Sequence, residues 1–278
     1  MLFKRNISRV RMFGHDIPQP TVLLDFLGFE EHVRQIREKR GTNIWPGWYD
    51  HAAYYVNDLP PEKLYGHNHE VTIPAYVSAP DYELELACFV IEPGLIKSFE
   101  QALDFFRNSC LLTILNDWSA RDIQLKDMLG LGPAHSKSII GKSIGPKFIS
   151  GSELTLDEDG VFDLAMKIKV NGKERLSSNY NSIYYQHPET AKRQAWSFPK
   201  LMHFLGQANI ALQPGYVLGS GTVGSGCIAE FMAKIDPATG KEVEPARYPW
   251  LKDGDTIQFE VEKLGLLENK VKISETNK

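Results

Sequence analysis

Three short stretches of alternating polar and apolar residues limit the fold of this chain more than any other feature. They cover Tyr82–Ile91, Phe162–Val170 and Thr256–Val261. A period of two is typical of β-strands, because successive side chains point to opposite faces of a sheet. Asn171-Gly172 follows the second stretch and predicts a tight hairpin turn. We therefore expect a strand-rich protein.

Two helices are expected to interrupt the strands. Ser98-Phe99-Glu100-Gln101 matches a capping box and predicts a helix that continues to about Asn108. The second helix is expected over Ser197–Leu205, with Gly206 as the residue that ends it. Because strands predominate and do not alternate regularly with helices, the sequence favours a β-rich α+β fold over a doubly wound sheet.

The chain shows no internal division. It has 278 residues without a repeat, a low-complexity tract or a linker, and its 42% hydrophobic content is enough to bury a sizeable core. We expect a short N-terminal segment, residues 1–20, and one catalytic domain, residues 21–278. Cys88, Cys110 and Cys227 lie in apolar strings and are odd in number, which favours reduced core thiols over disulfides or a zinc site.

Charge and hydropathy argue against two classes of partner. The 31 Lys and Arg against 35 Asp and Glu give a net charge of −4 with no basic block, so nucleic-acid binding is not indicated. Apolar runs such as Cys110–Leu115 are far shorter than the ~20 residues of a membrane-spanning helix. Residues 1–11 lack the apolar core of a signal peptide. We expect a cytoplasmic protein that does not bind membranes.

Two glutamates on the first predicted strand are candidates for metal binding. Alternation places Glu83 and Glu85 on one face, with Leu84 and Leu86 on the other. Side chains two apart on a strand lie ~7 Å from each other, where like charges repel by roughly 2 kcal/mol at an effective dielectric constant of ~20. A bound cation would reverse that cost. A solvated strand face is the alternative, and it is favoured if this segment is taken alone.

Two aspartates extend the candidate set. Asp117 ends the apolar run Leu111–Leu115, a position typical of a strand end at which side chains converge; a helix-capping Asp is the alternative. If the segment from Asp25 to His32 is helical, these two residues share one face, two turns apart. A solvated helix with Asp25 as its N-cap is the competing interpretation.

Four motifs carry a resemblance to a known family. Asn116–Gln124, with the sequence NDWSARDIQ, resembles the most distinctive motif of the fumarylacetoacetate hydrolase family. It is flanked, in the family's order and spacing, by the segments Asp81–Glu85, Gly132–Ser138 and Pro214–Thr222. These motifs span most of the chain from about residue 80 to residue 225.

The resemblance implies a fold, an assembly and a metal. It implies a homodimer, and a mixed β-roll or barrel with peripheral helices in each subunit. It also implies a Mg²⁺, Ca²⁺ or Mn²⁺ ion bound by Glu83, Glu85 and Asp117, with Asp25 as a fourth ligand. Oxygen ligands alone suit such hard cations.

The resemblance also implies a general base. The hydrolase branch of the family has an acid followed seven residues later by a catalytic His, as Asp25 is followed by His32. Its carboxylate partner follows the Gly-Thr segment on a strand, which points to Glu230. The acylpyruvase and isomerase branch has His-x-x-Glu instead, whereas His32 is followed by Gln35. A solvent-facing acid is the alternative for Glu230, and His51 is a rival base.

The resemblance assigns further residues to the substrate. Lys137 and Gln124 would stabilise an oxyanion, and Arg121 would position the motif or a substrate carboxylate. Tyr54, Tyr55 and Thr222 fall where the family places substrate-facing groups. A solvated lysine, a helix-surface glutamine and core or interface aromatic residues are the alternatives.

Together these features predict a metal-dependent hydrolase that cleaves a C–C bond in a small 1,3-diketo acid, similar to fumarylacetoacetate or an acylpyruvate. The alternatives are an isomerase, tautomerase or decarboxylase of 2-oxo acids, or a metal-binding family member without activity. The segment Gly219–Gly224 also fits G-x-G-x-x-G. We reject dinucleotide binding because Cys227–Met232 continues with strand-like alternation where a Rossmann turn must open a helix.

Overall fold

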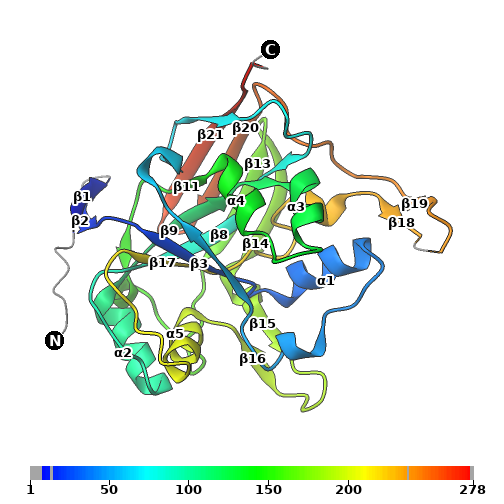
Figure 1. Cartoon of the computed structure of the whole chain (residues 1–278). Coiled ribbons are helices and arrows are strands. Elements are labelled where there is room, and N and C mark those ends of the chain that lie inside the picture. The colour runs from blue at the N-terminus through cyan, green and yellow to red at the C-terminus, as the bar shows by residue number, and fades with distance from the viewer. Residues whose placement is uncertain (1–7, 13–14, 237, 276–278) are drawn as a thin grey trace.

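The computed structural model describes residues 8–12, 15–236 and 238–275. A mixed sheet of eight strands runs in the order β4-β3-β17-β8-β9-β11-β5, with β12 paired to β9 beside this path (Figure 1). Its strands are β3 (Val22–Phe26), β4 (Tyr54–Asp58), β5 (Leu64–Tyr65), β8 (Leu84–Val90), β9 (Cys110–Asp117), β11 (Lys142–Ile144), β12 (Ile149–Ser150) and β17 (Tyr216–Gly219). The pairs β17–β3 and β11–β5 are parallel, whereas β8 pairs with both β9 and β17 antiparallel.

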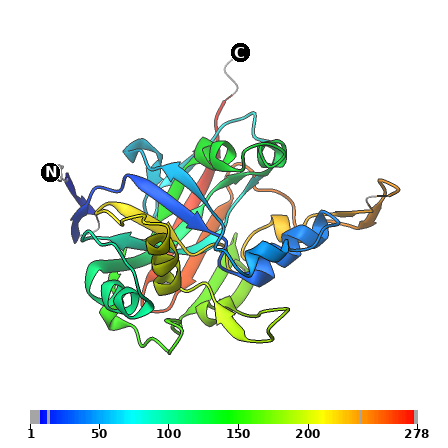
Figure 2. The same ribbon diagram turned by 60° about the horizontal axis from the view of Figure 1, so that its bottom comes forward.

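A second sheet of five strands has the order β14-β13-β20-β21-β6. Its strands are β6 (Glu70–Ile73), β13 (Ala165–Val170), β14 (Lys173–Asn179), β20 (Thr256–Val261) and β21 (Gly265–Ile273). The remaining strands form four pairs: β1 (Arg9–Met12) with β2 (His15–Pro18), β7 (Pro80–Asp81) with β10 (Ser119–Ala120), β15 (Tyr184–Gln186) with β16 (Arg193–Ala195), and β18 (Lys234–Ile235) with β19 (Glu242–Glu244). The β18–β19 hairpin projects from the body in two views (Figures 1 and 2).

The helices lie at the periphery of the sheets (Figure 1). They are α1 (Glu30–Lys39), α2 (Phe99–Ser109), α3 (Arg121–Asp127), α4 (Ala134–Ile140) and α5 (Phe198–Gln207). Short 3-10 helices are η1 (Pro46–Trp48), η2 (Pro61–Lys63), η3 (Gly151–Glu153), η4 (Tyr180–Ile183) and η5 (Ala229–Phe231). Helices α2 and α5 lie together, apart from α1, α3 and α4. The predicted strand-rich α+β fold is confirmed.

The central strand β8 is buried along its whole length because each face meets a different core. Leu84 and Leu86 belong to the main hydrophobic cluster. Ala87 and Phe89 belong to a second cluster, which also contains Ile17 from β2. Glu85 is on the same face as this second cluster, at the end nearer the start of the strand. The strand therefore carries its acid into the interior.

Several predicted elements occur close to their predicted bounds. β20 covers the predicted range, and α2 ends one residue beyond Asn108. Asn171 and Gly172 join β13 to β14 with φ angles of 52° and 73°, as a tight hairpin turn of this kind requires. The three cysteines are free and buried, as predicted.

Two predictions about helix ends were wrong. Gly206 lies inside α5, where it allows close packing: a Cβ atom there would lie 1.6 Å from the backbone oxygen of Ile96. The left-handed residue after this helix is Asn209, with a φ angle of 60°. At α2, the Ser98 hydroxyl accepts from Gln101 N as predicted, but the Gln101 side chain accepts from Lys97 N, so the reciprocal bond of a capping box is absent there.

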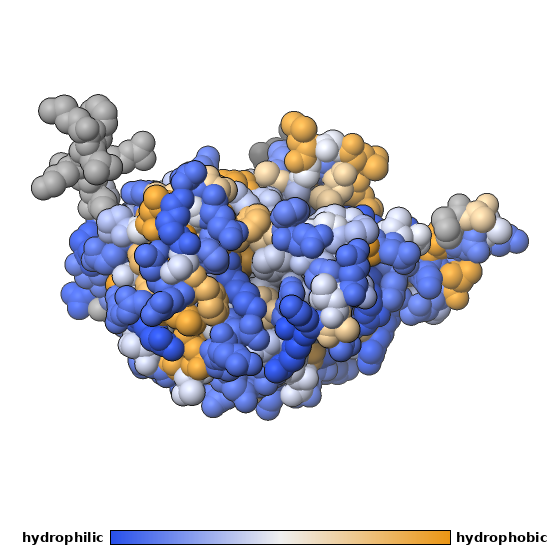
Figure 3. Space-filling model, turned by 90° about the horizontal axis from the view of Figure 1, so that it is seen from below, coloured by the Kyte–Doolittle hydropathy of each residue, from blue (hydrophilic) through white to orange (hydrophobic). Residues whose placement is uncertain are grey.

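The face seen in Figure 3 is mostly hydrophilic, with apolar side chains in separate groups. In the described parts of the chain, no helix is long and apolar enough to cross a membrane. The segment after Gly219–Gly224 forms an isolated bridge at Cys227 and the short η5, so neither a Rossmann helix nor the expected strand follows it.

Candidate active site

Three carboxylates from three neighbouring parts of the larger sheet meet in the interior. Asp25 comes from β3, Glu85 from β8 and Asp117 from the last position of β9. One oxygen from each of the three lies within 4.8 Å of the others, and all three side chains are buried. The alternatives of a solvated strand face and of helix-capping aspartates are therefore wrong for these residues.

Glycine at position 219 makes this approach possible. Gly219 is the last residue of β17, which lies between β3 and β8 and pairs with Asp25 and Ala87. A Cβ atom at this position would lie 2.1 Å from Asp25 Oδ1 and 3.0 Å from Glu85 Oε2. Any other residue would therefore occupy the space into which the two carboxylates project.

Hydrogen bonds hold the carboxylates but leave one oxygen free. Glu85 accepts from Gly221 N at 3.1 Å and from the Thr222 hydroxyl at 3.2 Å. The Tyr55 hydroxyl lies 2.7 Å from Asp25 Oδ2 and 2.5 Å from Asp117 Oδ2. Asp25 Oδ1 is buried and has no hydrogen-bond partner among the described residues.

Burial and mutual repulsion disfavour ionisation of two of these acids. Burial, reinforced by the charge of Asp117, raises the pKa of Asp25 to about 7. Burial and the neighbouring Asp25 raise the pKa of Glu85 well above its usual range. Burial also opposes ionisation of Asp117, but the ammonium groups of Lys137 and Lys142 outweigh it and lower the pKa of that carboxyl. A cation placed among the three oxygens would favour the ionised forms of all three.

The cluster fits a divalent cation of the hard type. Its donors are all carboxylate oxygens, which Mg²⁺, Ca²⁺ and Mn²⁺ prefer. Asp25 Oδ1, which has no hydrogen-bond partner among the described residues, can serve as a metal ligand. Gly219 leaves room for the ion beside it. Asp25, Glu85 and Asp117 are the residues that would hold the ion.

Glu83, predicted as a ligand, lies next to the cluster but is held by two cations. Arg121 Nη2 donates to its Oε1 at 2.6 Å, and the Lys137 ammonium contacts its Oε2. These charges lower the pKa of the Glu83 carboxyl although burial opposes them. Arg121 also donates to Asp81 at 2.8 Å and to the Gln124 oxygen at 2.9 Å. The Gln124 amide nitrogen is thereby turned to donate elsewhere.

The predicted base and its partner meet, although the elements that carry them differ from the prediction. His32 Nδ1 lies 3.0 Å from Glu230 Oε1, and both side chains are buried. Glu230 also accepts from the backbone N–H groups of Ser225 and Cys227 at 2.9 Å. Asp25 and His32 do not share a helix, because Asp25 lies on β3 and α1 begins at Glu30. Glu230 lies on η5, and the strand and the solvent-facing acid proposed for it were wrong.

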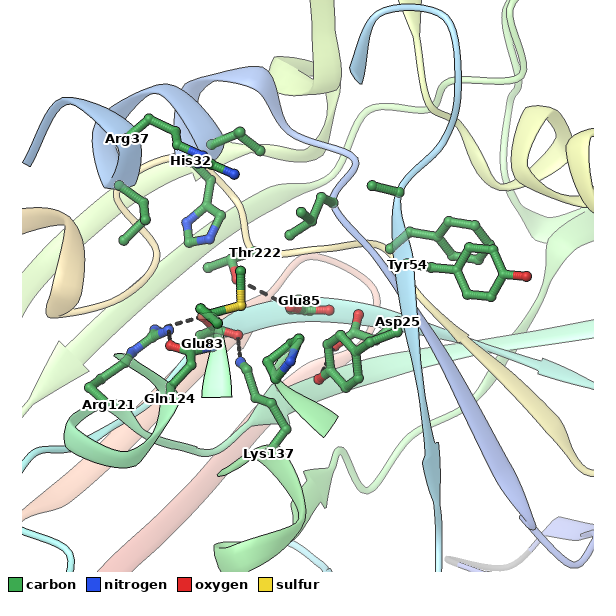
Figure 4. Close-up of a pocket in the computed structure, with 18 of the residues that line it drawn as sticks. Asp25, His32, Arg37, Tyr54, Glu83, Glu85, Arg121, Gln124, Lys137 and Thr222 are labelled. Atoms are coloured by element: carbon green, nitrogen blue, oxygen red, sulfur yellow. Dashed lines mark hydrogen bonds and ion pairs between the residues drawn. The ribbon is translucent and has the colours of Figure 1, made fainter. Parts of the chain in front are cut away.

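One cavity of about 330 Å³ connects these groups. His32 points into it from α1 on one side, Lys137 from α4 on the other, and the carboxylates of Glu83 and Glu85 lie between them (Figure 4). The other predicted site residues that line it are Asp25, Tyr54, Tyr55, Glu83, Glu85, Arg121, Gln124 and Thr222. His51, the rival base, is exposed and is not among the described residues that line this cavity.

The two tyrosines of β4 have different positions. The ring of Tyr54 packs on Phe26 with their centroids 4.9 Å apart, and its hydroxyl points away from the carboxylates (Figure 4). Tyr55 directs its hydroxyl to Asp25 and Asp117. Successive residues of a strand face opposite ways, so only Tyr55 reaches the acids.

Three features of the site had not been predicted. Lys142 bonds to Asp117 from the adjacent strand, and Gly219 makes room for the acids. Arg37 and Arg40 also line the cavity, and Arg40 Nε is buried without a partner among the described residues. The basic run at the end of α1 is a weak sequence signal for the two arginines. The contact between Lys142 and Asp117 depends on strand register, so no sequence pattern indicates it.

Comparisons with known proteins identify the family of this chain. Residues 21–272 match the family model described as fumarylacetoacetate (FAA) hydrolase C-terminal. A Dictyostelium discoideum protein, a fumarylacetoacetate hydrolase domain-containing protein 2 homolog, is 28% identical over 217 residues, which are 74% of this chain and 60% of that protein. An oxaloacetate tautomerase of Bos taurus is 27% identical over 72% of this chain and 53% of its own length. The chain thus spans little more than half the length of these two relatives.

A solved structure shows the same fold. Fumarylpyruvate hydrolase of Pseudomonas aeruginosa, determined in complex with Mn²⁺ and pyruvate, superimposes with a TM-score of 0.66 and covers 99% of each chain. At a sequence identity of 15%, this similarity concerns the fold alone.

Proposed function

The chain belongs to the fumarylacetoacetate hydrolase family, and within it we propose a metal-dependent hydrolase that cleaves a C–C bond of a small 1,3-diketo acid. The family's named members include a fumarylacetoacetase and an oxaloacetate tautomerase, so the type of reaction depends on the residues of this site. The observation that carries the proposal is the buried His32–Glu230 pair, because His32 lines the same cavity as the acid-cluster residues Asp25 and Glu85.

This pair has the geometry of an oriented general base. With Nδ1 donating to the Glu230 carboxylate, His32 Nε2 is left as the acceptor. Glu230 would stabilise the imidazolium formed when His32 takes a proton from water. The hydroxide oxygen would bond to the substrate carbonyl carbon, the C–C bond would then break, and His32 would return the proton to the carbon that leaves as an enolate.

The remaining groups suit the charges that this reaction creates. A divalent ion held by Asp25, Glu85 and Asp117 would supply Lewis-acid polarisation of a carbonyl and stabilise the enolate. The Gln124 amide can donate to the oxyanion of the tetrahedral intermediate, and the positive charge of the Lys137 ammonium, which also lines the cavity, stabilises that oxyanion. Arg121 orients the Gln124 amide, and with Asp81 and Glu83 it makes the wall of the site rigid.

Two arginines that line the cavity, Arg37 and Arg40, support an acidic substrate. Arg37 lies over the ring of Trp45, with its guanidinium carbon 4.9 Å from the centroid. Burial and the neighbouring cations Arg121 and Arg37 lower the pKa of Arg40. A substrate carboxylate would satisfy the free Arg40 Nε and offset this repulsion. We therefore expect the substrate to carry a carboxylate beside these arginines.

A product analysis tests the proposal. The purified protein is incubated with Mn²⁺ and a panel of acylpyruvates and fumarylacetoacetate-like diketo acids in ¹⁸O-labelled water. Hydrolysis predicts two acid products per turnover, with one ¹⁸O atom in the newly formed carboxylate. Proton exchange at carbon without cleavage, on oxaloacetate or on a diketo acid, would instead establish tautomerisation, the activity named for the Bos taurus relative. The absence of any turnover would contradict both assignments.

A further inference from the structure

Lys142 is a buried cation that the proposed reaction does not use. It lies at the start of β11, directly opposite Asp117 in the antiparallel register with β9, and only 2% of its surface is exposed. Its ammonium group contacts Asp117 Oδ1 and donates to the backbone oxygen of Lys137 at 2.7 Å. The nitrogen also lies 5.8 Å from the centroid of the Tyr55 ring. All three contacts are with residues of the site.

The two lysines beside Asp117 differ in their surroundings. Lys137 lines the cavity, and its ammonium reaches Asp117 Oδ2 at 2.6 Å and the Ser119 hydroxyl at 2.7 Å. Lys142 is not among the described residues that line the cavity. Its second bond is to a main-chain carbonyl, which cannot move away independently of α4. Lys137 is therefore placed to meet a ligand, whereas Lys142 is fixed behind Asp117.

We propose that Lys142 is a positioning residue that reserves Oδ1 of Asp117, so that the divalent ion takes the place of the Tyr55 and Lys137 donors on Oδ2 and binds this carboxylate through Oδ2 alone, with reduced affinity. The inference rests on the proposed metal site. A buried ammonium is stable only when it is paired, so the bond to Oδ1 is retained when the ion binds. It prevents two-oxygen coordination by Asp117, and its positive charge opposes that of the ion. As a result, Asp117 neutralises less of the ion's positive charge, and the ion polarises the substrate more strongly.

The same contact links the metal ligand to Lys137, whose charge would stabilise the oxyanion. By holding the backbone oxygen of Lys137, Lys142 fixes the position of α4 relative to Asp117. Removing the ammonium frees Asp117 Oδ1 and also loosens Lys137. Loss of the Lys142 ammonium should therefore have two opposite effects, tighter metal binding and slower turnover. The decrease in kcat should be larger than the change in KM.

Two variants separate charge from packing. Lys142→Met keeps the length of the side chain without its charge, and Lys142→Arg keeps the charge. Calorimetric titration with Mn²⁺ should show affinity increased about tenfold or more in Lys142→Met and within about threefold of wild type in Lys142→Arg. The rise in melting temperature caused by Mn²⁺ should also be larger for Lys142→Met. A Lys142→Met variant that is merely misfolded would instead bind Mn²⁺ more weakly than wild type and show a smaller rise in melting temperature on addition of Mn²⁺.

Wild-type protein provides a test that does not depend on a variant's folding. A crystal structure with Mn²⁺ should show Asp117 bound to the ion through Oδ2, with Lys142 still on Oδ1. Two-oxygen coordination by Asp117, or Mn²⁺ affinity that is unchanged or weaker in Lys142→Met, would overturn the role of Lys142. If the wild type itself binds no Mn²⁺, the proposed metal-dependent function fails, which is a different outcome.

Discussion

Gly219 is the residue whose size matters most for the site, because the two carboxylates project into the space that a side chain would fill. We predict that Gly219→Ala lowers Mn²⁺ affinity by about tenfold or more, since ligand positions must hold to within about 0.5 Å. Calorimetric titration checks this. Gly130→Ala is the matched control, because a Cβ there would meet only the Asp127 backbone oxygen at an ordinary 3.6 Å. Equal affinities in the two variants would contradict the crowding argument.

His32 should affect catalysis and not metal binding. A general base acts in the transition state, so His32→Ala should reduce kcat on a cleavable diketo acid by about 10²–10⁴. Its Nδ1 is bonded to Glu230 and not to the acid cluster, so Mn²⁺ affinity should stay close to that of wild type. His51→Ala, at an exposed position outside the cavity lining, is the control. A normal kcat in His32→Ala would place the base elsewhere.

Glu83, predicted as a metal ligand, is held beside the acid cluster by Arg121 and Lys137. If it binds the ion, Glu83→Gln should abolish the Mn²⁺ titration signal, as Asp25→Asn should. Glu100→Gln, on the exposed face of α2, controls for a general change of charge. Wild-type affinity in Glu83→Gln would remove this residue from the coordination sphere. Its function would then be to hold Arg121 and Lys137, which it already contacts.

Among the secondary-structure elements, α5 shows how close packing overrides helix propensity. Gly→Ala inside a helix is normally stabilising by about 0.5–1 kcal/mol. At Gly206, however, the new Cβ atom would lie 1.6 Å from the Ile96 backbone oxygen, so the helix must move. We predict that Gly206→Ala lowers the free energy of unfolding by about 1–3 kcal/mol, as overpacking does. Chemical denaturation measures this.

The exposed neighbour Gln207 provides the control for that measurement. Gln207→Ala should change the free energy of unfolding by less than about 0.5 kcal/mol, as is usual for surface positions. If Gly206→Ala were as stable as wild type, the separation between α5 and the Ile96 segment would have to be larger than the structure shows.

For the whole molecule, we propose a homodimer on the basis of the family resemblance. The exposed leucines Leu129 and Leu131, next to the cavity residues Met128 and Pro133, are apolar surface that a subunit interface can bury. Light scattering at micromolar concentration should give a mass twice the 31.4 kDa of one chain. A mass near that of the single chain would contradict the proposal.

The sequence alone was sufficient wherever the determining pattern is local. Alternation placed Glu83 and Glu85 on the face opposite Leu84 and Leu86, because the side-chain period of a strand is two in any fold. The Asn-Gly turn after β13 could be predicted because only a few residues tolerate positive φ angles. The motif around Asp117 and Arg121 identified the family, whose model matches most of the chain.

The tertiary structure decided everything that depends on which strands become neighbours. The order β3-β17-β8-β9 brings Asp25, Glu85 and Asp117 together, and no local pattern specifies that order. The Asp25-to-His32 spacing suggested a shared helix, yet a strand and a separate helix direct both side chains into the same cavity. Lys142 meets Asp117 only through the register of β11 with β9. Such contacts escape prediction from sequence because they join residues far apart in the chain, and the free energy that selects them comes from burying the entire core.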